Sequence, residues 1–127
     1  MAGVSFATLT NDGAFTGFLS RPVAYLPNYN RVLIAETDKN RIGLYNAKTF
    51  KFNCWLEHPN PTKGTEFKSP SCFLHHRNGH FFILEETQIN ILNCNFAPYQ
   101  QPIFGKFTGI SKGPNEDILI FQLHQGP

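Results

Sequence analysis

The polypeptide has 127 residues, of which 41% are hydrophobic, 14% aromatic and 16% charged, and its formal net charge is +2. This length suits one modest domain rather than two, and the apolar, aromatic composition excludes a disordered chain. The 13 Phe residues favour pleated, half-buried surfaces, so the composition predicts an all-β fold.

Cysteine usage and hydropathy indicate the compartment. Cys54, Cys72 and Cys94 are odd in number and show no C-x-x-C pairing, which argues against a disulfide framework or a zinc knuckle. The first residues lack the basic segment and unbroken apolar run of a leader, and no run of about 18 apolar residues occurs anywhere. We therefore expect a cytoplasmic protein that is not inserted in a membrane.

In chain order, the first predicted elements are two strands within residues 4–19, joined by an Asn-Asp-Gly turn. Four short strands follow, because apolar and polar residues alternate between turns rich in Pro, Asn, Asp and Lys. Antiparallel pairing of these four strands is expected. They lie near residues 22–25, 31–36, 41–46 and 51–56.

The chain then repeats the same order of elements. A Ser-Pro pair opens a strand, Asn78-Gly79 is a strong hairpin signal, and the stretches FFILEE and QINILN are the next two strands. Pro22 and Pro70 are 48 residues apart, and Glu36 and Glu85 are 49 residues apart, so the same acidic residue ends the second strand of both copies. After Phe107 the pattern begins a third time.

Repetition of four-strand units at this period is the sequence signature of a β-propeller, in which each unit is a blade. We therefore predict an all-β propeller segment of antiparallel four-stranded blades, about three blades in total. The single domain 1–127 would consist of the second half of a blade, two whole blades and the first half of another. These are residues 1–19, 20–67, 68–107 and 108–127.

The first whole unit, RPVAYLPNYNRVLIAETDKNRIGLYN, resembles the NHL repeat. The usual NHL phrase is a Pro entering the first strand, an apolar second strand ending in Asp-Thr, an Asn-His-Arg-Ile loop and a third strand. Here Glu36-Thr37 stands for Asp-Thr, and Lys39-Asn40 stands for Asn-His. The resemblance implies a six-bladed ring and, as in the NHL proteins attached to RING and B-box modules, loops on one face that bind RNA or proteins.

Three residues are expected to be structural. Glu36 ends a strand and can pair with Arg41, while Asn40 tolerates the backbone angles of the turn. Glu85 would do the same in the second unit. Trp55 ends the outer strand of the first blade, where a large ring is expected to seal two blades together.

Basic residues of the middle of the chain fall in the predicted loops. From Ser20 to Arg77 there are nine Lys or Arg residues against four Asp or Glu residues. A basic rim could meet phosphates or an acidic partner, although Asp38, Glu57 and Glu66 would neutralise much of it. We therefore expect a non-catalytic module that binds a protein partner, with RNA as the alternative. The candidate binding residues are Arg21, Lys39, Asn40, Arg41, Lys63 and Lys68.

Aromatic residues in or beside the loops could stack on bases if the partner is RNA. These are Tyr29, Trp55, His58 and Tyr99.

No motif indicates catalysis. Some NHL-like propellers are metal-dependent lyases, and His75, His76 and His80 could suggest a metal. Adjacent residues of a strand point to opposite faces, however, so His75 and His76 cannot converge on one ion. The sequence therefore predicts no catalytic residue, metal ligand or cofactor, with a lyase-like activity kept as the remote alternative.

The last expectation concerns ring closure. Propellers close with about four to eight blades, so three blades cannot form a comfortable ring. Two chains joined head to tail by a twofold axis would complete both half blades and give six. A homodimer is one expectation, and a longer chain that supplies the remaining blades is the other.

Overall fold

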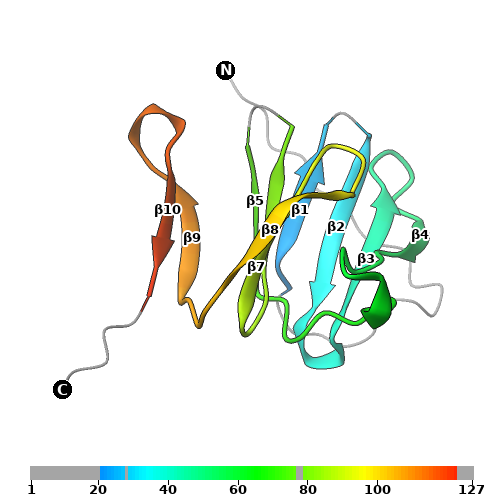
Figure 1. Cartoon of the computed structure of the whole chain (residues 1–127). Helices are drawn as coiled ribbons and strands as arrows, with labels where there is room; N and C mark the ends of the chain where they lie inside the picture. Colours follow the sequence, from blue (N-terminus) through cyan, green and yellow to red (C-terminus); the bar gives the residue numbers. More distant parts are fainter. Residues whose placement is uncertain (1–20, 28, 77–78, 123–127) are drawn as a thin grey trace.

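The computed structural model describes residues 21–27, 29–76 and 79–122, and these form three antiparallel sheets of four, four and two strands (Figure 1). The first sheet contains β1 (Val23–Leu26), β2 (Arg31–Glu36), β3 (Arg41–Asn46) and β4 (Phe52–Trp55). The second contains β5 (Cys72–His75), β6 (Phe81–Leu84), β7 (Gln88–Leu92) and β8 (Pro98–Phe104). The third contains β9 (Gly109–Lys112) and β10 (Ile118–Phe121).

Each sheet is a meander in which consecutive strands pair, in the orders β1-β2-β3-β4, β5-β6-β7-β8 and β10-β9. This confirms the predicted all-β fold built from antiparallel four-stranded units. The first sheet lies within the predicted unit 20–67 and the second within 68–107. The strand pair predicted for residues 4–19 lies outside the described residues.

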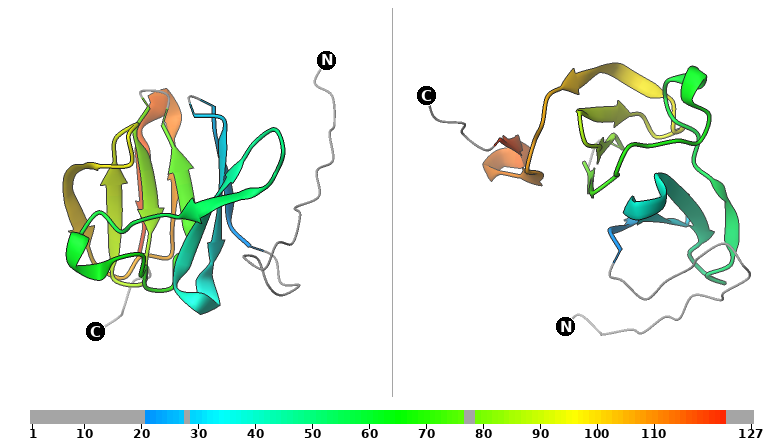
Figure 2. Two further views of the ribbon diagram at one scale, coloured as in Figure 1. Left: turned by 90° about the vertical axis from the view of Figure 1, so that its right-hand side faces the viewer. Right: turned by 90° about the horizontal axis from the view of Figure 1, so that it is seen from below.

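The three sheets lie side by side in chain order, and from below they follow an open arc rather than a closed barrel (Figures 1 and 2). The first strands of the units are neighbours, since β5 contacts both β1 and β9. In a propeller the first strand of each blade lies toward the centre and the later strands lie outside, and the three sheets have this arrangement.

Apolar side chains fill the two spaces between sheets. Between the first and second sheets the cluster includes Leu33, Ile42 and Ile83, all 0% exposed. Between the second sheet and β9–β10 it includes Ile89 and Ile110. Each such side chain contributes about 1.5–3 kcal/mol when it is withdrawn from water. The middle sheet therefore buries both of its faces, which is why β6 is continuously apolar and every residue of β7 is buried.

The hairpin that follows the second strand differs between the two units. In the first unit it contains a 3₁₀ turn, η1 (Thr37–Lys39), and ends at Asn40, whose φ of 57° is left-handed. Asn accepts this conformation more readily than most residues. Ala35 pairs with Ile42 in the first unit and Leu84 with Ile89 in the second, so the second hairpin is two residues shorter.

No helix in the described part of the chain has the length and apolar character needed to cross a bilayer.

Candidate functional site

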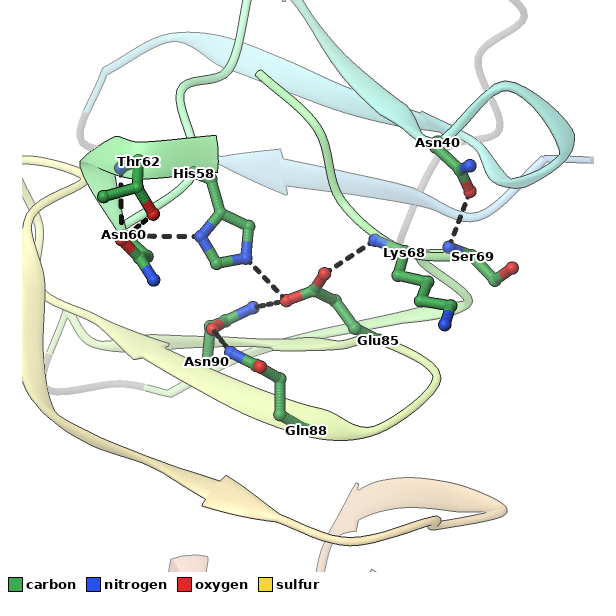
Figure 3. A network of polar contacts seen from close by, with 9 residues as sticks. All are labelled: Asn40, His58, Asn60, Thr62, Lys68, Ser69, Glu85, Gln88 and Asn90. Carbon is green, nitrogen blue, oxygen red and sulfur yellow. Dashed lines mark hydrogen bonds and ion pairs between the residues drawn. The ribbon is translucent and has the colours of Figure 1, made fainter. Parts of the chain in front are cut away.

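The linker between the two four-stranded sheets forms one side of the candidate site. It carries a 3₁₀ turn, η2 (Pro61–Lys63), which the side chain of Asn60 caps by accepting from the backbone N–H of Thr62 at 3.1 Å. The backbone N–H of His58 donates to the carbonyl oxygen of Gly64 at 2.7 Å, which closes the loop. The imidazole of His58, 4% exposed, is thereby directed toward the second sheet (Figure 3).

Glu85, which follows β6 and is 2% exposed, is the centre of a buried polar network (Figure 3). Its Oε1 accepts the backbone N–H of Lys68 at 2.7 Å, and its Oε2 accepts Nε2 of His58 at 2.8 Å and the side-chain amide of Asn90. Asn90 in turn accepts the amide of Gln88 at 2.7 Å. The network thus ties the linker to β6 and β7.

Both ring nitrogens of His58 are engaged. Nδ1 accepts the backbone N–H of Asn60 at 2.9 Å, so in this arrangement Nδ1 carries no proton and Nε2–H is the donor to Glu85. The imidazole is neutral in this tautomer and has no nitrogen left to take a proton from a substrate. His58 and Glu85 are therefore engaged with each other and with the surrounding protein.

The carboxyl of Glu85 is held in its ionised form. Burial by itself raises its pKa, but the hydrogen bonds from His58, from Asn90 and from the backbone of Lys68 outweigh burial and leave the pKa below its usual range. A carboxylate that accepts three donors is satisfied even in a dry environment.

The corresponding acid of the first sheet is Glu36, 1% exposed, and it has different partners. Arg41 donates to it at 3.2 Å, and the Arg41 guanidinium lies 3.9 Å from the centre of the Trp55 ring. The pairing expected between Glu36 and Arg41 is therefore present. The strand register places Gln88 at the position of Arg41 and Asn90 at that of Gly43, so the second sheet supplies amides where the first supplies a cation.

Trp55 makes its stacking contacts within the first sheet. Its ring lies 4.8 Å from that of Phe52, and the Arg41 guanidinium covers it. By strand register Trp55 lies on the same face of the first sheet as Gly43, Ile34 and Val23, the face turned away from the second sheet, so its expected role in sealing two blades stays a prediction.

A groove of about 860 Å³ lies between the linker and the outer strands β7 and β8, and we call it the linker groove. Its base includes the buried side chains of His58, Gln88 and Asn90. Its rim is rich in proline and aromatic residues, and Tyr99 and Phe104 are 53% and 71% exposed. The remaining rim residues include Pro59, Pro61, Lys63, Pro98, Gln100 and Pro102.

The predicted binding residues other than Lys63 lie around the first hairpin, because Arg21 pairs with Asp38 and Asn40 binds the backbone of Phe67 and Ser69, on either side of Lys68. Arg21 forms an ion pair with Asp38, Arg41 pairs with Glu36, and the ammonium of Lys68 lies 3.7 Å from Glu86. Three of the five expected cations therefore face acidic partners.

The remaining predicted binding residues are Asn40, Lys39 and Lys63. The side chain of Asn40 accepts the backbone N–H of Ser69 at 2.9 Å and so fastens the first hairpin to the linker (Figure 3). Lys39 is exposed on η1, and Lys63 lines the linker groove. Of the six residues predicted to bind, Lys63 is the one that the structure brings to the groove.

The sequence indicates two residues of the groove, His58 and Tyr99, as loop aromatics, but carries no signal that brings them together. Gln88 and Asn90 were not predicted as site residues. The available signal was the pattern QINIL, where polar residues interrupt a strand that the structure buries throughout. A buried amide in such a strand needs a partner, and here that partner is Glu85.

Within the described ranges, no group of three His, Cys, Asp or Glu side chains is arranged to hold a metal ion. Comparison of the chain with models of known protein families and with curated protein sequences gives no match.

Proposed function

We propose that the chain is an NHL-type propeller segment that acts as a non-catalytic interaction module, and that it holds an extended segment of a partner protein in the linker groove. The observation that carries the proposal is a preformed groove with an exposed aromatic and proline-rich rim over a base of buried polar side chains. Binding sites of this kind are concave and mostly apolar, with a few fixed polar groups.

The state of the polar base favours binding over catalysis. His58 uses both ring nitrogens within the protein, and Glu85 accepts three internal hydrogen bonds. A catalytic acid or base must direct its own proton-transferring atom at the substrate. A satisfied network instead keeps the linker and β7 in fixed relative positions, so that a partner is met by a rigid surface and loses less entropy on binding.

Charge favours a polypeptide over RNA. Among the described residues that line the groove, Lys63 is the only one of the types Lys, Arg, Asp and Glu. Phosphate recognition needs several clustered cations, whereas one lysine beside aromatic and proline side chains suits a peptide with a single acidic residue. We therefore infer a partner segment with an Asp or Glu next to apolar residues.

Selection of 12-residue peptides from a phage-displayed library tests the proposal. Peptides that bind the wild-type chain are synthesised and titrated by calorimetry against Tyr99→Ala, with Tyr25→Ala as a control of similar exposure away from the groove. We expect Tyr99→Ala to weaken binding about tenfold or more, as for an aromatic hot spot. Equal affinity for both variants would contradict the site.

A parallel titration with a 12-nucleotide polyuridine tests RNA. We expect no measurable binding at physiological salt. Tight binding that weakens steeply as salt rises, together with no selected peptides, would favour the RNA alternative over the protein partner.

A further inference from the structure

We propose that two copies of this chain join head to tail, so that the β10 end of each copy packs against the first-sheet end of the other and the arc closes into a ring. The inference does not depend on the linker groove. It rests on two exposed apolar faces, one at each end of the arc, which are complementary halves of a contact that the chain already makes internally.

The first open face is on β10. Ile120 pairs with Ile110 of β9, and Ile110 is buried against the second sheet. Because successive side chains of a strand alternate between faces, Leu119 and Phe121 project from the opposite face. They are 39% and 51% exposed.

Interior units show what this face normally does. The second strand of the first sheet directs Leu33 and Ala35 into the space before the next sheet, and both are 0% exposed. In the second sheet Leu84 does the same toward β9–β10 and is 2% exposed. Leu119 and Phe121 occupy this role in the third unit, where the described residues provide no following sheet.

The second open face is on β1. Leu33 faces the second sheet, and its partner across the strands is Ala24, so Val23 and Tyr25 project the other way. They are 59% and 55% exposed. The residue that corresponds to Val23 in the second unit is Phe73, which packs against the cluster between the first two sheets.

One end of the arc therefore presents the face that receives a preceding blade, and the other presents the face that receives a following blade (Figure 1). A second copy is the occupant that supplies both, because each copy carries one of each. Contacts between unlike faces close into a ring when the rotation between copies allows it, and here the rotation is a half turn about the propeller axis.

An unpaired strand edge adds to the case. Strand β10 pairs with β9 on one side, and in the described part of the chain its other edge has no partner strand. A bare edge with exposed Leu119, Ile120 and Phe121 is a template for pairing with another chain. The strand pair that the sequence predicts for residues 4–19, outside the described residues, would bring the ring of two copies to six blades.

Multi-angle light scattering on the whole 127-residue chain measures the outcome directly. We expect a particle of twice the chain mass of 14.4 kDa. Val23→Asp and Phe121→Asp should each raise the dimer dissociation constant at least tenfold, with unchanged circular dichroism, because a charge is then buried in every contact. Phe104→Asp, at a 71% exposed position of β8 away from both faces, is the matched control and should remain dimeric.

Mixing the two variants distinguishes head-to-tail joining from pairing of like ends. In a mixed dimer one contact carries both substitutions and the other is entirely wild type, so the mixture should associate at a concentration where neither variant does alone. A monomeric wild-type chain, a dimer that survives either substitution, or a mixture that stays monomeric would overturn the proposal. Tyr25→Asp and Leu119→Asp repeat the test at neighbouring positions should a first variant fold poorly.

Discussion

A buried glutamate stands at the end of the second strand in both units, Glu36 as the last residue of β2 and Glu85 directly after β6, and the two units satisfy it by different means. Glu36 receives a guanidinium that is itself covered by an indole ring. Glu85 receives an imidazole and an amide, together with a backbone N–H of the linker. In each case the carboxylate fastens the end of a hairpin, but Glu85 also fastens the linker and so forms part of the candidate site.

Glu85→Gln should destabilise the protein. A glutamine amide must direct its NH₂ group at one of the donors that the carboxylate now accepts, which leaves buried hydrogen-bonding groups without partners. We expect a loss of about 1–3 kcal/mol in the free energy of unfolding, measured in urea. Glu86→Gln changes a neighbouring carboxylate that is 46% exposed, and should have little effect.

The lowered pKa of Glu85 predicts how the difference in stability between wild type and Glu85→Gln depends on pH. Its folded-state pKa lies below the ordinary value of 4.5, so the carboxylate contributes stability that is fully present above pH 4.5 and is lost as the pH falls through the folded-state pKa. The gap in unfolding free energy between wild type and Glu85→Gln should therefore be widest near neutral pH and narrow below pH 4.5. A gap that widens on acidification would contradict the assignment.

Gly43 has a packing role that a methyl group should reveal. A Cβ at this position would lie 2.9 Å from a ring carbon of buried Tyr45 and 3.4 Å from the ring of Trp55. Gly43→Ala should therefore cost about 1–3 kcal/mol through overpacking, measured by thermal or urea unfolding. Gly109→Ala is the control, since a Cβ there meets no atom within 4 Å. Equal stability of the two variants would show that Tyr45 can move aside.

At the scale of the element, the strands could be predicted because their signals are local. Alternation with a period of two and turns at Pro, Asn and Gly placed β2 and β3 at the residues where the structure has them. The linker groove could not be predicted in this way. Its two sides come from residues 58–63 and 98–104, and the pairing of sheets that brings them together leaves no local pattern.

The charge pattern along the sequence says little about which cations face a partner. The loops of the first 77 residues carry more Lys and Arg than Asp and Glu, and the structure pairs Arg21, Arg41 and Lys68 with acids. The Glu36–Arg41 pair was predicted from the sequence, whereas Glu86, the partner of Lys68, was not among the predicted acids. Net charge describes a segment, and only tertiary contacts decide which cations remain for a partner.

Ile34→Asp tests the central strand of the first sheet. Ile34 is 3% exposed in β2, and an unpaired carboxylate there should cost several kcal/mol out of a total stability of about 5–15 kcal/mol. We expect loss of the cooperative unfolding transition in circular dichroism. Asn53→Asp places the same charge at an exposed position of β4 and should leave the unfolding transition in place.

At the scale of the whole molecule, the two proposed surfaces use different strands. The linker groove lies on β7, β8 and the linker, whereas the open ends of the arc are on β1 and β10. Phe121→Asp, which should separate the copies, is therefore expected to leave the affinity for a selected peptide within about twofold of wild type. A large loss of peptide affinity in this variant would mean that the groove is complete only in the assembled ring.

Amide chemical-shift mapping on the ¹⁵N-labelled chain, saturated with a selected peptide, tests the binding account most directly. The account predicts that the largest shifts fall in residues 58–63 and 98–104, on the two sides of the linker groove, with little change in the hairpin 37–41. Shifts concentrated in 37–41 with the groove unchanged would contradict it, and would return the binding site to the basic loops.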